Sequence, residues 1–160
     1  MKRMLLLLLI VLSFPVLCMG ESAIQSEGNM SYIITGEGAV IIDWNNQLPD
    51  VLDATLYVPP TLGGIPVVGI GFDAFDTCNE GPSTQFQLIL PEGITFLEKG
   101  AFQCCNQATV ISLPSTLETI PEGSFIHVKA KIVFPNGNPY FTAEHGFLID
   151  NRTNTLLYTS

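Results

Sequence analysis

The chain has 160 residues, with 15 Asp and Glu against 6 Lys and Arg, so its formal net charge is −9 at pH 7. A negative surface repels the phosphates of nucleic acids and the headgroups of anionic lipids. Nucleic acid is therefore excluded as an expected partner. The length and the composition fit one exported globular domain.

Residues 1–20 predict a secretory signal peptide. Two basic residues precede an apolar stretch at 4–17, and small residues at Cys18 and Gly20 favour cleavage after Gly20. The stretch is shorter than the ~20 apolar residues of a transmembrane helix, so we expect no membrane span. Lipidation at Cys18 is the alternative interpretation. Cleavage would leave 4 basic and 15 acidic residues, and 4 − 15 gives a net charge of −11.

Four short parallel strands are expected along the chain. An apolar residue followed by Pro occurs at Val58-Pro59, Leu90-Pro91, Leu113-Pro114 and Phe134-Pro135. A β-rich run comes just before each Pro, at 54–58, 86–90, 109–113 and 130–134. Pro has no N–H for a strand ladder and ends each run.

A second pattern recurs in register with the first. Counting back from a Phe, a small residue stands at minus 1 and aliphatic residues stand at minus 5 and minus 8. The Phe residues are Phe75, Phe102 and Phe125, which are 27 and then 23 positions apart. A period of about 20–29 residues is typical of solenoids built from leucine-rich-repeat coils, in which stacking closes the core.

The C-terminal segment predicts a β-hairpin. Residues 147–150 and 155–158 are two apolar runs, and Asn151-Arg152-Thr153-Asn154 forms a four-residue turn between them. We expect this hairpin to cover the apolar end that a stack of repeats would otherwise expose.

Residues 94–105 resemble the repeat of BspA-type leucine-rich-repeat proteins (the leucine-rich repeat 5 family). That repeat has an aliphatic pair, a Gly, then Ala-Phe, and a Cys or polar residue three positions later. Residues 32–41 resemble the family's lead-in strands, and residues 138–158 resemble its hairpin unit. The third repeat departs from the pattern, since Ile126-His127-Val128 follows Phe125 without a Cys.

The expected fold is an α/β repeat solenoid, mostly β: a leucine-rich-repeat right-handed coil with short parallel strands and a C-terminal β-hairpin. The expected organisation is a signal peptide at 1–20, lead-in strands at 21–50, the solenoid at 51–137 and the hairpin cap at 138–160.

Three cysteines would remain after cleavage. Cys78 and Cys105 both stand three residues after a Phe, so they occupy equivalent positions on adjacent coils. Adjacent strands lie about 4.8 Å apart, which fits the ~4.4–6.8 Å Cα separation of a disulfide. One interpretation is a Cys78–Cys105 disulfide, and the other is two small buried hydrophobes. Cys104 would then be the unpaired thiol.

Catalysis, cofactors and metals have no recognisable motif in the sequence. His127 and His145 stand in no hydrolase or metal pattern, and no Gly-rich phosphate loop follows a strand. Asp73 and Asp76 flank Ala74-Phe75 in one short turn, which does not favour paired acid–base catalysis. We therefore expect a protein that is not an enzyme, with no cofactor and no metal.

The outward residues of the four strands are the candidate binding face. Because side chains alternate along a strand, the residues at minus 4 and minus 2 from each Pro should point outward. The predicted face comprises Tyr57, Gln87, Ile89, Val110, Ser112, Lys131 and Val133, with Thr55 beside them. Tyr57, Ile89, Val110 and Val133 are expected to form a contiguous apolar patch, which on a soluble protein often marks an interaction site.

The resemblance implies protein binding or adhesion. The function expected from the sequence is thus a secreted or cell-surface module that binds a protein or another cell-surface or matrix macromolecule. The alternative is a structural spacer or self-associating envelope subunit without a dedicated ligand.

Overall fold

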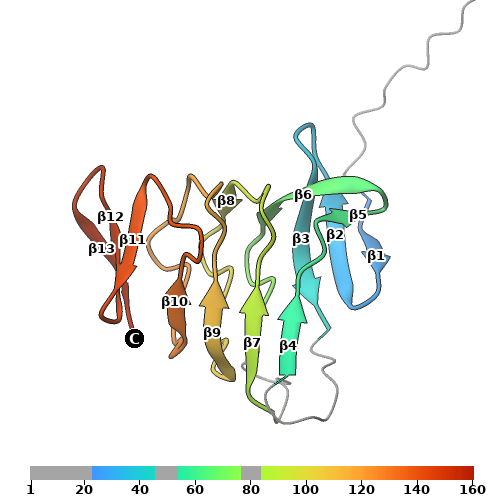
Figure 1. Cartoon of the computed structure of the whole chain (residues 1–160). Coiled ribbons are helices and arrows are strands. Elements are labelled where there is room, and N and C mark those ends of the chain that lie inside the picture. The colour runs from blue at the N-terminus through green and yellow to red at the C-terminus, as the bar shows by residue number, and fades with distance from the viewer. Residues whose placement is uncertain (1–22, 46–53, 77–83) are drawn as a thin grey trace, which may run out of the picture.

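The computed structural model describes residues 23–45, 54–76 and 84–160, and within them it contains thirteen strands and no helix (Figure 1). No helix in these residues could cross a membrane. The predicted signal peptide, residues 1–20, lies outside the described residues.

The strands form three sheets of different type. A mixed sheet holds β1 (Gln25–Glu27), β2 (Met30–Ile34), β3 (Ala39–Trp44), β6 (Ile65–Ile70) and β5 (Thr61–Leu62), with β8 (Phe96–Leu97) also paired to β6. A parallel sheet runs in the order β10 (Lys131–Val133), β9 (Ala108–Ser112), β7 (Phe86–Ile89) and β4 (Ala54–Tyr57). An antiparallel sheet holds β11 (Phe141–Glu144), β12 (Phe147–Asp150) and β13 (Thr155–Thr159).

The expected α/β repeat solenoid is wrong, because the described chain is all strand and turn and only one of its three sheets is purely parallel. The reason lies in the turns around each Phe. Gly100 and Cys104, two residues before and two after Phe102, have φ of 76° and 56°. Gly123 and His127 repeat this around Phe125, with φ of 88° and 56°. Left-handed residues on both sides of the Phe leave no run long enough for a helix.

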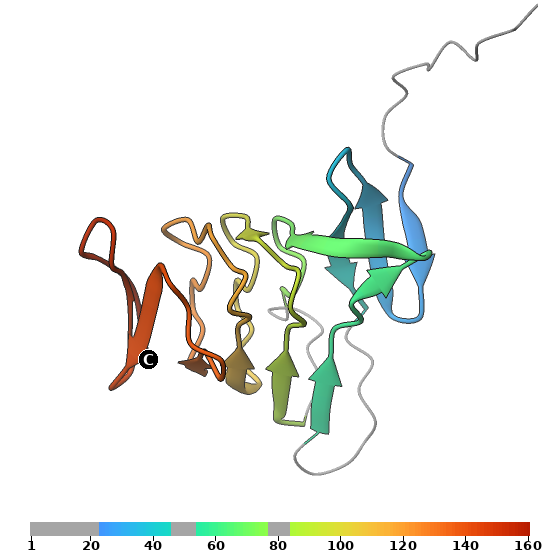
Figure 2. The ribbon, with the colours of Figure 1, turned by 45° about the horizontal axis from the view of Figure 1, so that its top comes forward.

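The four strands predicted before each Pro are nevertheless present, each within one residue of its expected ends, and they pair in parallel. Successive turns are also joined by equivalent backbone hydrogen bonds. The N–H of Phe75 donates to the carbonyl of Ala101, and the N–H of Phe102 donates to that of Ser124, both at 3.0 Å. Figure 2 shows the turns following one another beside the parallel sheet.

An aromatic stack runs through the core. The rings of Phe75 and Phe102 have centroids 5.4 Å apart, and those of Phe102 and Phe125 are 5.3 Å apart and nearly parallel. Trp44 from β3 packs on Phe75 at 5.7 Å, and Tyr158 from β13 packs on Phe125 at 5.4 Å. All five side chains are buried. The three repeat Phe residues therefore lie in one column that is closed by another aromatic ring at each end.

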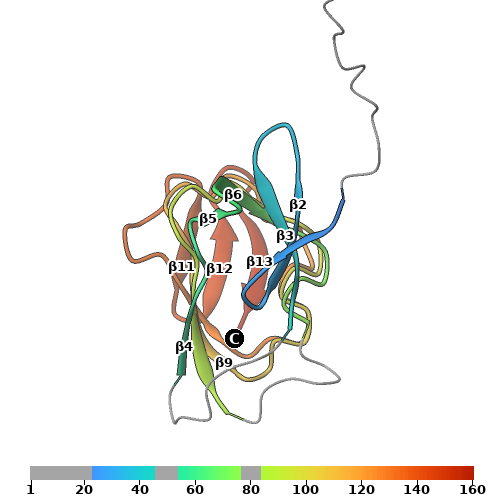
Figure 3. The same ribbon diagram turned by 90° about the vertical axis from the view of Figure 1, so that its right-hand side faces the viewer.

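The C-terminal sheet covers the end of this column. The predicted hairpin is confirmed as β12 and β13, and β11 adds a third strand. The hydroxyl of Tyr158 donates to the carbonyl of Ala130 at 2.7 Å, so β13 is fixed to the last turn before β10. Viewed along the stack, the C-terminal sheet lies within the outline of the turns (Figure 3).

A carboxylate connects three successive turns on the surface. Glu92 accepts hydrogen bonds from the hydroxyl of Ser115 at 2.9 Å, from the N–H of Thr116 at 3.2 Å and from the amide of Asn136 at 3.0 Å. The hydrogen bond from Asn136, supported by those from Ser115 and Thr116, lowers the pKa of Glu92 below its ordinary value of 4.5. The ionised carboxylate is thus the form that suits this position.

Asp73 occupies the turn position that Gly100 and Gly123 take in the next two repeats. It has a left-handed φ of 54°, and its buried Oδ1 has no hydrogen-bond partner. Burial, and secondarily the charge of Asp76, raise the pKa of Asp73 above its ordinary value of 3.8. A raised folded-state pKa means that the ionised carboxylate destabilises the fold at neutral pH.

Phe102→Ala should lower the free energy of unfolding by about 3–5 kcal/mol, because it leaves a cavity between two stacked rings. Urea unfolding monitored by the fluorescence of Trp44, the only Trp of the chain, measures the change. Phe72→Ala is the matched control, since Phe72 is 60% exposed and should lose little. A loss no larger for Phe102→Ala than for the control would contradict the aromatic stack.

Asp73→Asn should raise the free energy of unfolding at pH 7, since Asn also tolerates a left-handed φ and carries no charge. In the parent protein, the loss of stability caused by the ionised Asp73 carboxylate is absent below the unfolded-state pKa and grows as the pH rises through the folded-state pKa. The advantage of the variant should therefore shrink towards pH 3.8, the ordinary pKa of the group. Urea titrations of both proteins between pH 3.5 and 7 test this, and a difference that does not change with pH would contradict it.

Candidate functional site

The candidate site is the outer face of the parallel sheet, here called the strand face. Its side chains lie in two cross-strand rows: Thr55, Gln87, Val110 and Lys131 in one, and Tyr57, Ile89, Ser112 and Val133 in the other. The four strands lie side by side in Figure 1. The residues that the sequence predicted to point outward therefore pair with one another across the strands. Whether they bind a partner stays a prediction.

Burial follows the predicted alternation along each strand. The inward side chains Leu88, Ile111 and Ile132 are buried, whereas Thr55, Gln87 and Lys131 are exposed. Tyr57 is 69% exposed, and Ile89, Val110 and Val133 are half-buried. Ser112 is an exception among the outward residues, since only 9% of it is exposed.

The expected contiguous apolar patch is interrupted. Ile89 lies beside Tyr57, but Ser112 separates Ile89 from Val133 in the same row. Val110 belongs to the other row, between Gln87 and Lys131. The most exposed apolar surface of the strand face is therefore at its β4 end, around Tyr57 and Ile89.

Backbone hydrogen bonds hold the strand face together up to each Pro. The N–H of Val58 donates to the carbonyl of Ile89 at 3.0 Å, and the N–H of Leu90 donates to that of Ser112 at 3.0 Å. The following residue is Pro in each case and donates nothing, so the ladder ends there. The result is a short, regular sheet whose side chains are fixed in register.

The strand face differs in charge from the rest of the chain. β4, β7, β9 and β10 contain no Asp or Glu, although the whole chain has a net charge of −9. Lys131, at the β10 end, is exposed and makes no ion pair within the described residues. The face is thus neutral to slightly positive on an acidic protein.

A hollow of about 300 Å³ borders the strand face at Tyr57. Besides Tyr57 it is lined by Leu56 and Pro59 from the same segment, by Leu62 from β5, and by Glu27, Gly28, Asn29 and Met30 from the β1–β2 hairpin. Sequence reasoning missed this hollow. Its walls come from segments about thirty residues apart, and no local sequence pattern predicts that the β1–β2 hairpin lies beside β4.

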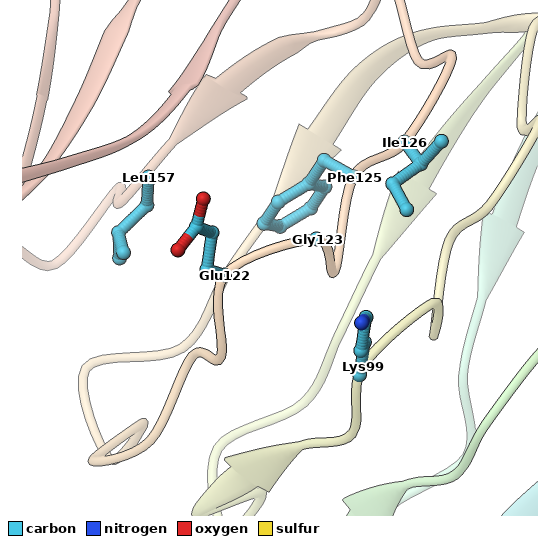
Figure 4. Close-up of a pocket in the computed structure, with 6 residues that line it drawn as sticks. All are labelled: Lys99, Glu122, Gly123, Phe125, Ile126 and Leu157. Atoms are coloured by element: carbon cyan, nitrogen blue, oxygen red, sulfur yellow. The ribbon is translucent and has the colours of Figure 1, made fainter.

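A second, larger hollow of about 690 Å³ lies between the repeat turns and the C-terminal sheet. It is lined by Lys99, Glu122, Gly123, Phe125, Ile126 and Leu157 (Figure 4). None of the predicted site residues lines it. Its floor is the edge of the aromatic column at Phe125, and two opposite charges stand at its sides.

The two adjacent cysteines Cys104 and Cys105 have different states. Cys105 has a free thiol and is fully buried, and burial raises the pKa of this thiol to about 12. Of the two interpretations, the Cys78–Cys105 disulfide is therefore not formed, and Cys105 is a small buried side chain as the other one has it; Cys78 itself lies outside the described residues. Cys104, expected to be the unpaired thiol, is in a disulfide instead. The physical reason is the left-handed φ of Cys104, which directs consecutive side chains apart, with Cys105 in the core.

The residues considered for catalysis lie in three different turns. His127 and His145 are both exposed and both have left-handed φ values, of 56° and 53°. Asp73 and Asp76 share one turn, where the backbone N–H of Asp76 donates to the carbonyl of Asp73. Within residues 23–45, 54–76 and 84–160, no group of three or more His, Cys, Asp or Glu side chains could hold a metal ion.

Comparison with known proteins gives two structural likenesses. No family model matches the chain, and no curated protein matches it. A leucine-rich cell surface protein from Faecalibacterium prausnitzii is 19% identical with a TM-score of 0.47, over 71% of this chain and 33% of that one. The pneumococcal vaccine antigen PcpA is 14% identical with a TM-score of 0.37, over 86% of this chain and 56% of that one. The chain thus spans about a third of the first protein and just over half of the second, and its membership of the BspA-type family stays a prediction.

Proposed function

We propose that this chain is a secreted or cell-surface protein that binds another protein through the strand face and does not catalyse a reaction. The observation that carries the proposal is Tyr57, which is 69% exposed on a regular sheet next to the half-buried Ile89. Tyr is enriched at interface centres, because its ring gives a large contact area with a polar end.

The rigidity of the strand face supports the same role. Its side chains stand on strands that are held by backbone ladders and by the aromatic column beneath them. A partner then meets a preformed surface, and little conformational entropy is lost at this surface on binding. The location outside the cell rests on the signal peptide predicted at residues 1–20.

The absence of acidic residues from the strand face also favours an interface. The chain has a net charge of −9, so acidic side chains are common outside this face. Their absence from the face removes the repulsion that a partner with acidic residues would otherwise meet there. Interface cores are depleted in Glu and Asp and enriched in aromatic residues, which matches the β4 end of the face.

Ile89→Arg with Val133→Asp should abolish binding to the partner, because two charges would then be buried at the contact. Residues 21–160 are passed over immobilised cell-surface and matrix extracts, and retained proteins are identified for parent and variant. Ile34→Arg is the matched control, since Ile34 is 37% exposed on β2 and lies away from the strand face. Circular dichroism checks that every variant is folded.

Retention by the parent and by Ile34→Arg, with loss in the double variant, is the expected result. Equal retention by all three proteins would mean that another surface binds. No retention by any of them would contradict a binding role and favour a structural one.

A further inference from the structure

The hollow beside Tyr57 has the chemistry of a recognition pocket. Its walls are apolar, with buried Met30 and Leu62 and half-buried Leu56, and the ring of Tyr57 stands exposed at its side. Its volume of about 300 Å³ is at the lower end of the ~300–1,000 Å³ typical of ligand sites, enough for one large side chain.

One negative charge is fixed at this hollow. Glu27 lines it, and its Oε2 accepts a hydrogen bond from the N–H of Gly63 at 2.6 Å. Gly63 has a left-handed φ of 58°, which turns its N–H towards the β1–β2 hairpin. The other oxygen, Oε1, makes no hydrogen bond within the described residues and is available to a ligand.

Among the residues that the structure describes, no positive side chain lines the hollow, so they offer an anionic ligand no charged partner there. A cation would find two binding partners in the hollow. One is the carboxylate of Glu27, and the other is the π face of Tyr57, which attracts cations within about 6 Å of its centroid. The apolar walls suit a long alkyl stem, since Arg and Lys pack their methylene groups on apolar surface and keep the charge at the rim.

We infer that this hollow receives an arginine side chain of the partner protein, held between the carboxylate of Glu27 and the ring of Tyr57. Arginine fits better than lysine, because its planar guanidinium stacks on an aromatic ring and donates to a carboxylate at the same time. The inference rests on the proposed function, and it identifies one basic side chain on the contact surface of the partner.

The charge of the whole chain supports a basic partner. The net charge of −9 attracts a positively charged partner to the molecule as a whole. Within the contact itself the strand face adds no acidic residue, so Glu27 is the negative charge that fixes the position of the guanidinium. The rest of the acidic surface then accelerates encounter, and the hollow determines the register.

The test uses the tripeptide acetyl-Gly-Arg-Gly-amide as the probe, titrated into the ¹⁵N-labelled protein and followed by NMR. The backbone amides of residues 27–30, 56–58 and 61–62 should shift. The same peptide with citrulline in place of arginine keeps the shape but has no charge, and it should bind at least about tenfold more weakly, as loss of a charge-assisted hydrogen bond implies.

Two variants with matched controls locate the site. Glu27→Gln should weaken binding of the arginine probe about tenfold, whereas Glu37→Gln, which changes the net charge equally at another exposed position, should not. Tyr57→Ser should weaken it about two- to fivefold, whereas Phe72→Ser, at a similarly exposed aromatic residue, should not.

Equal binding of the arginine and citrulline probes would overturn the inference, as would equal effects of each variant and its control. Shifts of the same amides by methyl β-glucopyranoside, without shifts by the arginine probe, would instead identify a sugar site. If the extracts yield a partner that needs the strand face but the probe does not bind, only this inference fails. If the probe binds but no partner is retained, the proposed function fails and the arginine site at the hollow is still supported.

Discussion

The aromatic column is the interaction on which the rest of the structure depends. Each of its three repeat Phe rings comes from a different turn, so no turn buries its own ring without both neighbours. Trp44 and Tyr158 close the two ends, which joins the mixed sheet and the C-terminal sheet to the same core. The parallel sheet is a consequence, because turns stacked at a fixed ring spacing place their strands side by side.

The sequence predicted the positions of the repeats well and their conformation poorly. Phe102 and Pro114 mark a buried ring and a strand end by simple chemistry, and both are where they were expected. The all-strand character depended on Cys104 and His127, which adopt left-handed conformations that side-chain type does not predict. The parallel pairing of β3 with β6 was equally invisible, since it joins segments that share no pattern.

The candidate site shows the same division. Two-residue alternation was enough to place Tyr57 and Ile89 on the outer face of the sheet. It could not reveal Glu27, which lines the hollow from another sheet and whose carboxylate accepts a hydrogen bond from the N–H of Gly63. The two cysteines are a second example. Cys104 and Cys105 are adjacent in sequence, yet Cys104 is in a disulfide and Cys105 is a free thiol in the core.

Glu92 has a consequence for how this chain tolerates change in length. Its carboxylate is bonded to Ser115, Thr116 and Asn136, so the spacing between three successive turns is fixed by one side chain. A change in length between positions 92 and 115 would displace Ser115 and Thr116 from this carboxylate, and one between positions 116 and 136 would displace Asn136. Substitution on the exposed turns is compatible with the fold, whereas variation in length belongs to other segments, such as the turn at Gly36 and Glu37, which is exposed to solvent.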